Sequence, residues 1–140
     1  MTLVLDASVA IKLYIAETDS DVALNAVASE GDFIAPDLLF VEVGQALLRH
    51  HRERRLSWLQ LDVALVDLTR KVRSPVRDAV LLRRAVALAE VLSHGLHDCF
   101  YLALAERIGC DLLTADEVLV QKVRRSALSI PVRLLNEERP

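Results

Sequence analysis

Two short apolar runs, each followed by an aspartate, constrain the fold of this 140-residue chain more than any other feature. Residues 3–5 precede Asp6, and residues 112–115 precede Asp116. Apolar runs of this length, followed by helical periodicity, are typical of strands buried in a parallel sheet. The carboxyl ends of parallel strands meet at one edge of the sheet, where open α/β folds bind their ligands. We therefore expect Asp6 and Asp116 to lie on the same rim.

Strands and helices alternate along the rest of the sequence. Apolar runs at residues 33–35 and 132–135 predict two more strands, and a short strand near Val76 is also expected. The expected helices cover residues 8–15, 38–54, 80–92 and 97–108, and three more begin near residues 20, 57 and 117. Gly95 and Gly109 are expected to terminate helices. This alternation predicts an α/β fold, a three-layer α/β/α sandwich with a parallel sheet, formed by a single domain over residues 1–140.

The composition is that of a folded, globular chain. Apolar residues make up 53% of the sequence and charged residues 26%, a balance that excludes intrinsic disorder. No apolar run approaches the roughly 20 residues that cross a bilayer, and the N-terminus lacks the pattern of a secretory signal. We therefore expect a cytoplasmic protein that does not enter membranes. Cys99 and Cys110 match no zinc or redox spacing and are expected to be buried thiols.

The charge is slightly acidic overall but unevenly distributed. A net charge of −3 argues mildly against a nucleic-acid-binding surface. Residues 49–55 are nevertheless strongly basic, so that Arg49 and Arg52 either contact RNA phosphates or form a solvated helix end. Lys12, near the expected acidic rim, either neutralises a phosphate or is an ordinary surface lysine.

Two more acids occupy unusual positions on predicted helices. Glu42 falls on the apolar stripe of its helix, three residues after Leu39 and four before Ala46. A carboxylate that faces a core is costly unless it is paired or binds a metal. Asp98 stands in the first turn of its helix, on the same face as Tyr101, where a carboxylate also gains from the helix dipole.

Together, Asp6, Glu42, Asp98 and Asp116 predict a divalent cation site. Like charges in a partly buried site repel one another, and a cation removes this conflict. Ligands that are all oxygen atoms favour Mg²⁺ or Mn²⁺, and such an ion supports hydrolysis of a phosphodiester. Each acid also has a simpler interpretation alone: Asp6 and Asp116 as helix caps, Asp98 as a partner of the dipole, Glu42 as a paired structural acid.

Four segments resemble the motifs of the PIN-domain ribonucleases, and within them the VapC-type toxins of bacterial toxin–antitoxin pairs. Residues 3–9 resemble the first motif, and Ala35-Pro36 with residues 39–43 the second. Residues 98–106 are similar to the third motif and residues 113–116 to the fourth. Each segment is weakly specific alone, but the four occur in the family's order and span nearly the whole chain.

This resemblance implies an α/β/α sandwich, a homodimer, metal-dependent endoribonuclease activity, and inhibition by a small VapB-type antitoxin that covers the acidic pocket. The matching motifs make Asp6, Glu42, Asp98 and Asp116 the expected catalytic and metal-binding residues. Ser8 and Thr114 are expected to support them through hydroxyl hydrogen bonds. Two positions depart from the pattern: Gln45 replaces the asparagine common there, which puts its support of the acids in doubt, and His97 precedes Asp98, either as a pH-sensitive neighbour or as an exposed residue.

One other function remains open from the sequence, and two are disfavoured. A catalytically silent PIN-fold module would retain the fold only to bind a partner protein. A receiver-like phospho-aspartate switch also uses acids at strand ends, but residues 131–134 offer no lysine for it. Dinucleotide binding is disfavoured, because no glycine-rich loop follows the first strand.

Overall fold

The computed structural model describes residues 2–137, which contain one parallel four-stranded sheet. Its strands are β1 (Thr2–Leu5), β2 (Asp32–Ile34), β3 (Leu112–Thr114) and β4 (Val132–Leu134), in the order β2-β1-β3-β4. Leu3 pairs with Phe33 on one side of β1, and Leu5 pairs with Leu113 on the other. Because β1 and β3 are adjacent and parallel, their carboxyl ends open onto the same rim, as the sequence predicts.

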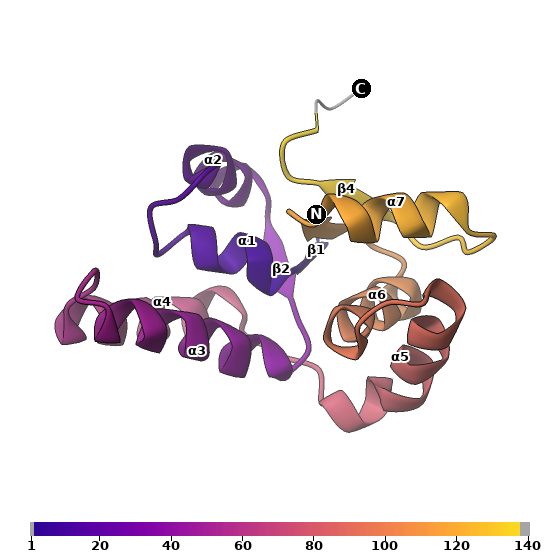
Figure 1. Cartoon of the computed structure of the whole chain (residues 1–140), viewed down its shortest axis with the longest axis horizontal. Coiled ribbons are helices and arrows are strands. Elements are labelled where there is room, and N and C mark those ends of the chain that lie inside the picture. The colour runs from indigo at the N-terminus through magenta and orange to yellow at the C-terminus, as the bar shows by residue number, and fades with distance from the viewer. Residues whose placement is uncertain (1, 138–140) are drawn as a thin grey trace.

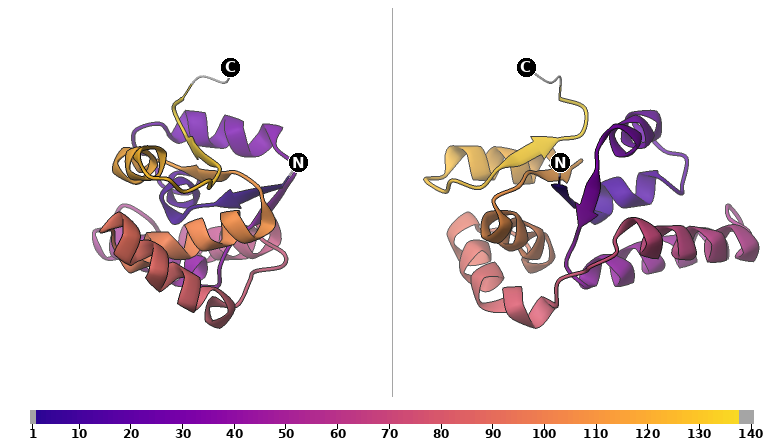
Figure 2. Two further views of the ribbon diagram at one scale, coloured as in Figure 1. Left: turned by 90° about the vertical axis from the view of Figure 1, so that its right-hand side faces the viewer. Right: turned by 180° about the vertical axis from the view of Figure 1, so that it is seen from behind.

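Helices cover both faces of this sheet (Figures 1 and 2). Helices α1 and α2 lie on one side, and α5, α6 and α7 lie on the other, which is the arrangement that right-handed crossovers impose on this strand order. The α3–α4 hairpin extends away beyond the sheet. The helices are α1 (Ala7–Lys12), α2 (Ser20–Ser29), α3 (Leu38–Arg52), α4 (Trp58–Lys71), α5 (Asp78–Leu92), α6 (Leu96–Ile108) and α7 (Glu117–Arg125). The predicted α/β/α sandwich is confirmed.

Several boundaries differ from the sequence-based prediction for local reasons. The first helix stops at Lys12 rather than at residue 15, because a turn follows. Helix α5 ends at Leu92, and its C-cap residue Ser93 adopts a left-handed conformation with φ 48°. Gly95 therefore does not terminate α5 but is the N-cap residue of α6. Around Val76 the chain forms only an isolated bridge to Pro36 instead of a strand.

Strand β1 and helix α6 form the most completely buried part of the core. Residues 3–5 of β1 are fully buried, and residues 99–105 of α6 are buried on every side of the helix. Helix α6 packs against both α5 and the sheet, so it carries no solvent-exposed stripe along this stretch. Cys99 is buried as expected, whereas Cys110 is only partly buried. Within residues 2–137, no helix combines the length and the apolar character that spanning a bilayer requires.

Candidate metal centre at the carboxyl edge of the sheet

Asp6 occupies the first position after β1 and is almost completely enclosed, with 4% of its surface exposed. Its Oδ2 accepts hydrogen bonds from Ser8 Oγ at 2.5 Å and from Thr114 Oγ1 at 2.7 Å. Burial raises the pKa of the Asp6 carboxyl from 3.8 to about 6, and the charges of Asp98 and Glu42 act in the same direction. The two hydroxyl donors oppose this rise but do not cancel it.

Ser8 and Thr114 connect Asp6 to the turn that carries the next acid. Ser8 Oγ accepts from the backbone N–H of Ala115 at 3.0 Å, and Thr114 Oγ1 accepts from the backbone N–H of Asp116 at 3.1 Å. Each hydroxyl therefore donates to Asp6 and accepts from the β3–α7 turn, which fixes the rotamer of the acid and the path of the turn together. The hydroxyl hydrogen bonds expected of Ser8 and Thr114 are thus present, and their support of a metal site stays a prediction.

Glu42 reaches the site from the first half of α3, where the fold turns it toward α6. The Tyr101 hydroxyl donates to Glu42 Oε1 at 2.9 Å, and the Tyr101 side chain is fully buried. Burial raises the pKa of Glu42, the nearby charges of Asp98 and Asp78 add to this effect, and the Tyr101 hydrogen bond opposes it. The carboxylate on the apolar stripe is therefore partnered by a phenol and lies within the electrostatic reach of Asp98.

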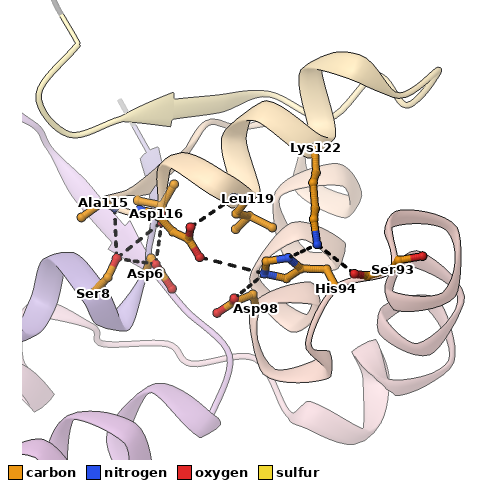
Figure 3. A network of polar contacts seen from close by, with 10 residues as sticks. Asp6, Ser8, Ser93, His94, Asp98, Ala115, Asp116, Leu119 and Lys122 are labelled. Atoms are coloured by element: carbon orange, nitrogen blue, oxygen red, sulfur yellow. Dashed lines mark hydrogen bonds and ion pairs between the residues drawn. The ribbon is translucent and has the colours of Figure 1, made fainter.

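Asp98 and Asp116 complete the rim from α6 and from the start of α7 (Figure 3). Asp116 caps α7, its Oδ1 accepting from the backbone N–H of Leu119 at 3.1 Å. Between the two acids lies His94, whose Nε2 is 2.6 Å from Asp98 Oδ2 and 3.9 Å from Asp116 Oδ2. One ligand atom from each of these three residues lies within 4.8 Å of the other two.

The four acids predicted from the sequence therefore converge, but not as one uniform group. Asp98 and Asp116 share His94, Asp6 is held by two hydroxyls, and Glu42 is held by a phenol. His94 was missed by the sequence analysis, which considered His97 instead. The signal was present, since His94 precedes Asp98 by four residues, but the expected helix boundary at Gly95 separated the two.

The remaining predicted residues lie away from the acids or are engaged elsewhere. Gln45 is exposed on α3 and makes no hydrogen bond to an acid within residues 2–137. Lys12 Nζ donates to the carbonyl of Thr18 at 2.7 Å and approaches Glu17 Oε1 at 3.3 Å, so its charge is directed into the following turn. Arg49 and Arg52 are exposed near the end of α3. His97 is exposed, and its charge lowers the pKa of Glu42.

This donor set fits a divalent cation of the Mg²⁺ or Mn²⁺ type. Carboxylate oxygens dominate it, as hard cations require. The pKa of Asp6, raised to about 6 by burial and neighbouring negative charges, shows an electrostatic conflict that a bound cation would relieve. Asp6, Glu42, Asp98 and Asp116 are the residues that would hold the ion.

Comparison with known proteins assigns the chain to a family. The PIN domain family model matches residues 3–125. This chain belongs to the PIN-domain family. Ribonuclease VapC3 from Pyrobaculum aerophilum is 37% identical over 126 residues, which cover 87% of this chain and 95% of that protein.

Two solved structures share this fold. VapC20 from Mycobacterium tuberculosis, described as a toxin that cleaves the sarcin–ricin loop, superposes with a TM-score of 0.68 at 15% identity, over 85% of this chain and 94% of that one. VapBC2 from Rickettsia felis, solved with a promoter DNA fragment, gives a TM-score of 0.64 at 10% identity, over 96% and 98% of the two chains. At these identities the likeness concerns the arrangement of helices and strands.

Proposed function

We propose that this PIN-domain protein is a VapC-type endoribonuclease that depends on Mg²⁺ or Mn²⁺ and acts as the toxin of a toxin–antitoxin pair. The convergence of Asp6, Glu42, Asp98 and Asp116 at the carboxyl edge of the sheet is the observation that carries this proposal. The 37% identity to a protein named as a ribonuclease supports RNA as the substrate class. A divalent cation supplies Lewis-acid stabilisation of the charge that develops on a phosphodiester during hydrolysis.

The residues of the chain prepare the site in three ways. Ser8 and Thr114 hold Asp6 in one rotamer, so that this acid needs no reorganisation when a cation arrives. Tyr101 on α6 donates a hydrogen bond to Glu42 on α3 and so directs this carboxylate toward the acidic cluster. Asp116 uses Oδ1 to cap α7 and leaves Oδ2 directed at the centre of the cluster.

The partners are part of the proposal. A VapB-type antitoxin is the expected inhibitor, since the R. felis relative is named for a VapBC complex. A homodimer is expected from the family resemblance, and Trp58, Leu59 and Val63 on α4 offer exposed apolar surface for either kind of contact. Light scattering of the purified chain, alone and with the antitoxin, measures the mass of the homodimer and of the complex.

The catalytic proposal is tested with a labelled stem–loop RNA and a DNA of the same sequence. We expect cleavage of the RNA with Mn²⁺ or Mg²⁺, no cleavage in EDTA, and a loss of on the order of 10²-fold or more for Asp98→Asn. Asp62→Asn, which neutralises an exposed acid on α4, is the matched control and retains activity. Parent-level cleavage by Asp98→Asn, or cleavage that persists in EDTA, contradicts the proposal. A wild-type protein that neither cleaves RNA nor binds Mn²⁺ by calorimetry is instead the silent binding module.

A further inference from the structure

His94 occupies the turn between α5 and α6, a position that the four-acid scheme does not explain. Its side chain is only 10% exposed, and its Nε2 is 2.6 Å from Asp98 Oδ2 (Figure 3). The other ring nitrogen, Nδ1, lies 3.2 Å from Nζ of Lys122 on α7. Lys122 Nζ also donates to the carbonyl of Ser93 at 2.8 Å, so the ammonium is tied to the same turn at two points.

The chemistry of the lysine determines the state of the histidine. An ammonium group has three donors and no acceptor. His94 Nδ1 must therefore accept from Lys122, which places the ring proton of the neutral imidazole on Nε2. The Nε2–H then donates to Asp98 Oδ2 at 2.6 Å.

The same reasoning argues against His94 as a metal ligand, although the three-residue cluster invites that reading. Ligation through Nε2 requires a lone pair on that nitrogen and hence the ring proton on Nδ1. That proton would face the Lys122 ammonium, a group with nothing to accept it, across the short Nδ1–Nζ distance. Ligating carboxylates are commonly oriented by such outer donors, and loss of the donor weakens the metal site.

We propose that Lys122 and His94 form a hydrogen-bonded relay in which Lys122 fixes the imidazole tautomer and His94 positions Asp98 for the cation. Both are positioning residues, and the inference rests on the proposed function because Asp98 is taken as a metal ligand. The relay restrains the Asp98 carboxylate through the hydrogen bond from His94 to Oδ2. It also couples α7, whose N-cap residue is Asp116, to the turn before α6, so the carboxylates of Asp98 and Asp116 keep one spacing.

Calorimetric titration of Mn²⁺ separates this relay from simple electrostatics. Lys122→Met removes a positive charge that repels a cation at the site, so Coulomb forces alone predict tighter Mn²⁺ binding by this variant. The relay predicts the opposite sign: weaker binding, with Lys122→Arg closer to wild type because it still donates. Arg125→Met is the matched control, since Arg125 is exposed on the same helix and forms no ion pair among the described residues. Tighter or unchanged binding by Lys122→Met overturns the proposal.

Variants at His94 distinguish positioning from ligation. We expect His94→Leu to weaken Mn²⁺ binding by about 10–100-fold, and His94→Gln to recover much of it, because the amide N–H can still donate to Asp98. Equal losses for both variants, with a nitrogen coupling in the Mn²⁺ spin-echo spectrum of the wild type, overturn the relay in favour of a nitrogen ligand. Circular dichroism of each variant confirms that it is folded before titration.

Nitrogen NMR tests the tautomer without metal or RNA. In the wild-type protein we expect His94 Nδ1 to resonate in the range of an unprotonated ring nitrogen and Nε2 in the range of a protonated one. Lys122→Met should lose this preference. A wild-type ring that is protonated on Nδ1 alone overturns the relay, even if RNA cleavage proceeds as proposed. The expected tautomer in a protein that cleaves no RNA supports the relay and contradicts only the proposed nuclease function.

Discussion

Replacement of Asp6 by asparagine tests whether the site is electrostatically strained without metal. The folded protein raises the pKa of Asp6 from 3.8 to about 6, chiefly by burial. The native state therefore binds more protons than the unfolded chain between these two values. Stability must then fall as the pH rises through this window and stay low above it.

The size of the effect follows from the shift. A difference of about two pH units, at 1.36 kcal/mol per unit, makes the metal-free protein less stable above pH 6 by about 3 kcal/mol. Asparagine carries no charge and removes this cost, although its amide N–H destabilises the folded state by about 1 kcal/mol if it finds no acceptor. Asp6→Asn should thus gain about 2 kcal/mol at pH 8, a rise of about 6 °C in Tm for a domain of this size.

The assay is thermal or urea unfolding in EDTA at pH 8 and at pH 4. We expect Asp6→Asn to be more stable than wild type at pH 8 and to lose this advantage at pH 4, where the wild-type carboxyl is protonated. Asp62→Asn, an exposed acid, should change little at either pH. A variant less stable than wild type at pH 8, or an equal difference at both pH values, refutes the reasoning.

Two further predictions concern packing around the site. Tyr101→Phe removes the donor to Glu42 Oε1, so it should destabilise the metal-free protein by about 1–3 kcal/mol at pH 8, measured by urea unfolding; an unchanged midpoint would show that solvent replaces the phenol. Leu88→Ala opens a cavity between α5 and α6 at a fully buried position and should cost about 2–5 kcal/mol, whereas Leu82→Ala, about half exposed on the same helix, should stay within about 0.5 kcal/mol. Comparable losses at the two leucines would contradict the assigned burial.

The rim of the sheet could be predicted from sequence because it depends on local pattern. Residues 3–5 and 112–114 are short apolar runs, so their strands and the acids after them follow from periodicity and from the parallel topology. Glu42 was recognisable because an ionised group on an apolar stripe conflicts with helix burial. These signals require only the spacing of residues along one element.

The partners of the acids were less accessible, because they depend on how separate elements meet. Lys122 lies 28 residues from His94, and Tyr101 lies 59 residues from Glu42. Gln45 entered the prediction only through the family resemblance, with its support of the acids in doubt, and the helix turns its side chain to solvent. Which side chains meet depends on how each helix is rotated about its axis and on how the helices cross. No short stretch of sequence determines these two quantities.

Asp116, the last residue before α7, combines two roles in one side chain: it caps the helix and it adds a negative charge to the acidic cluster. Oδ1 of Asp116 accepts the hydrogen bond that caps the helix, whereas Oδ2 faces His94 in the acidic cluster. An asparagine would keep the carbonyl that serves the helix while giving up the charge. A glutamate would keep the charge but place it one carbon farther from the backbone. It would lose the N-cap hydrogen bond, which is worth about 1 kcal/mol. Substitutions at this position can therefore remove the charge without losing the helix cap, or remove the cap without losing the charge.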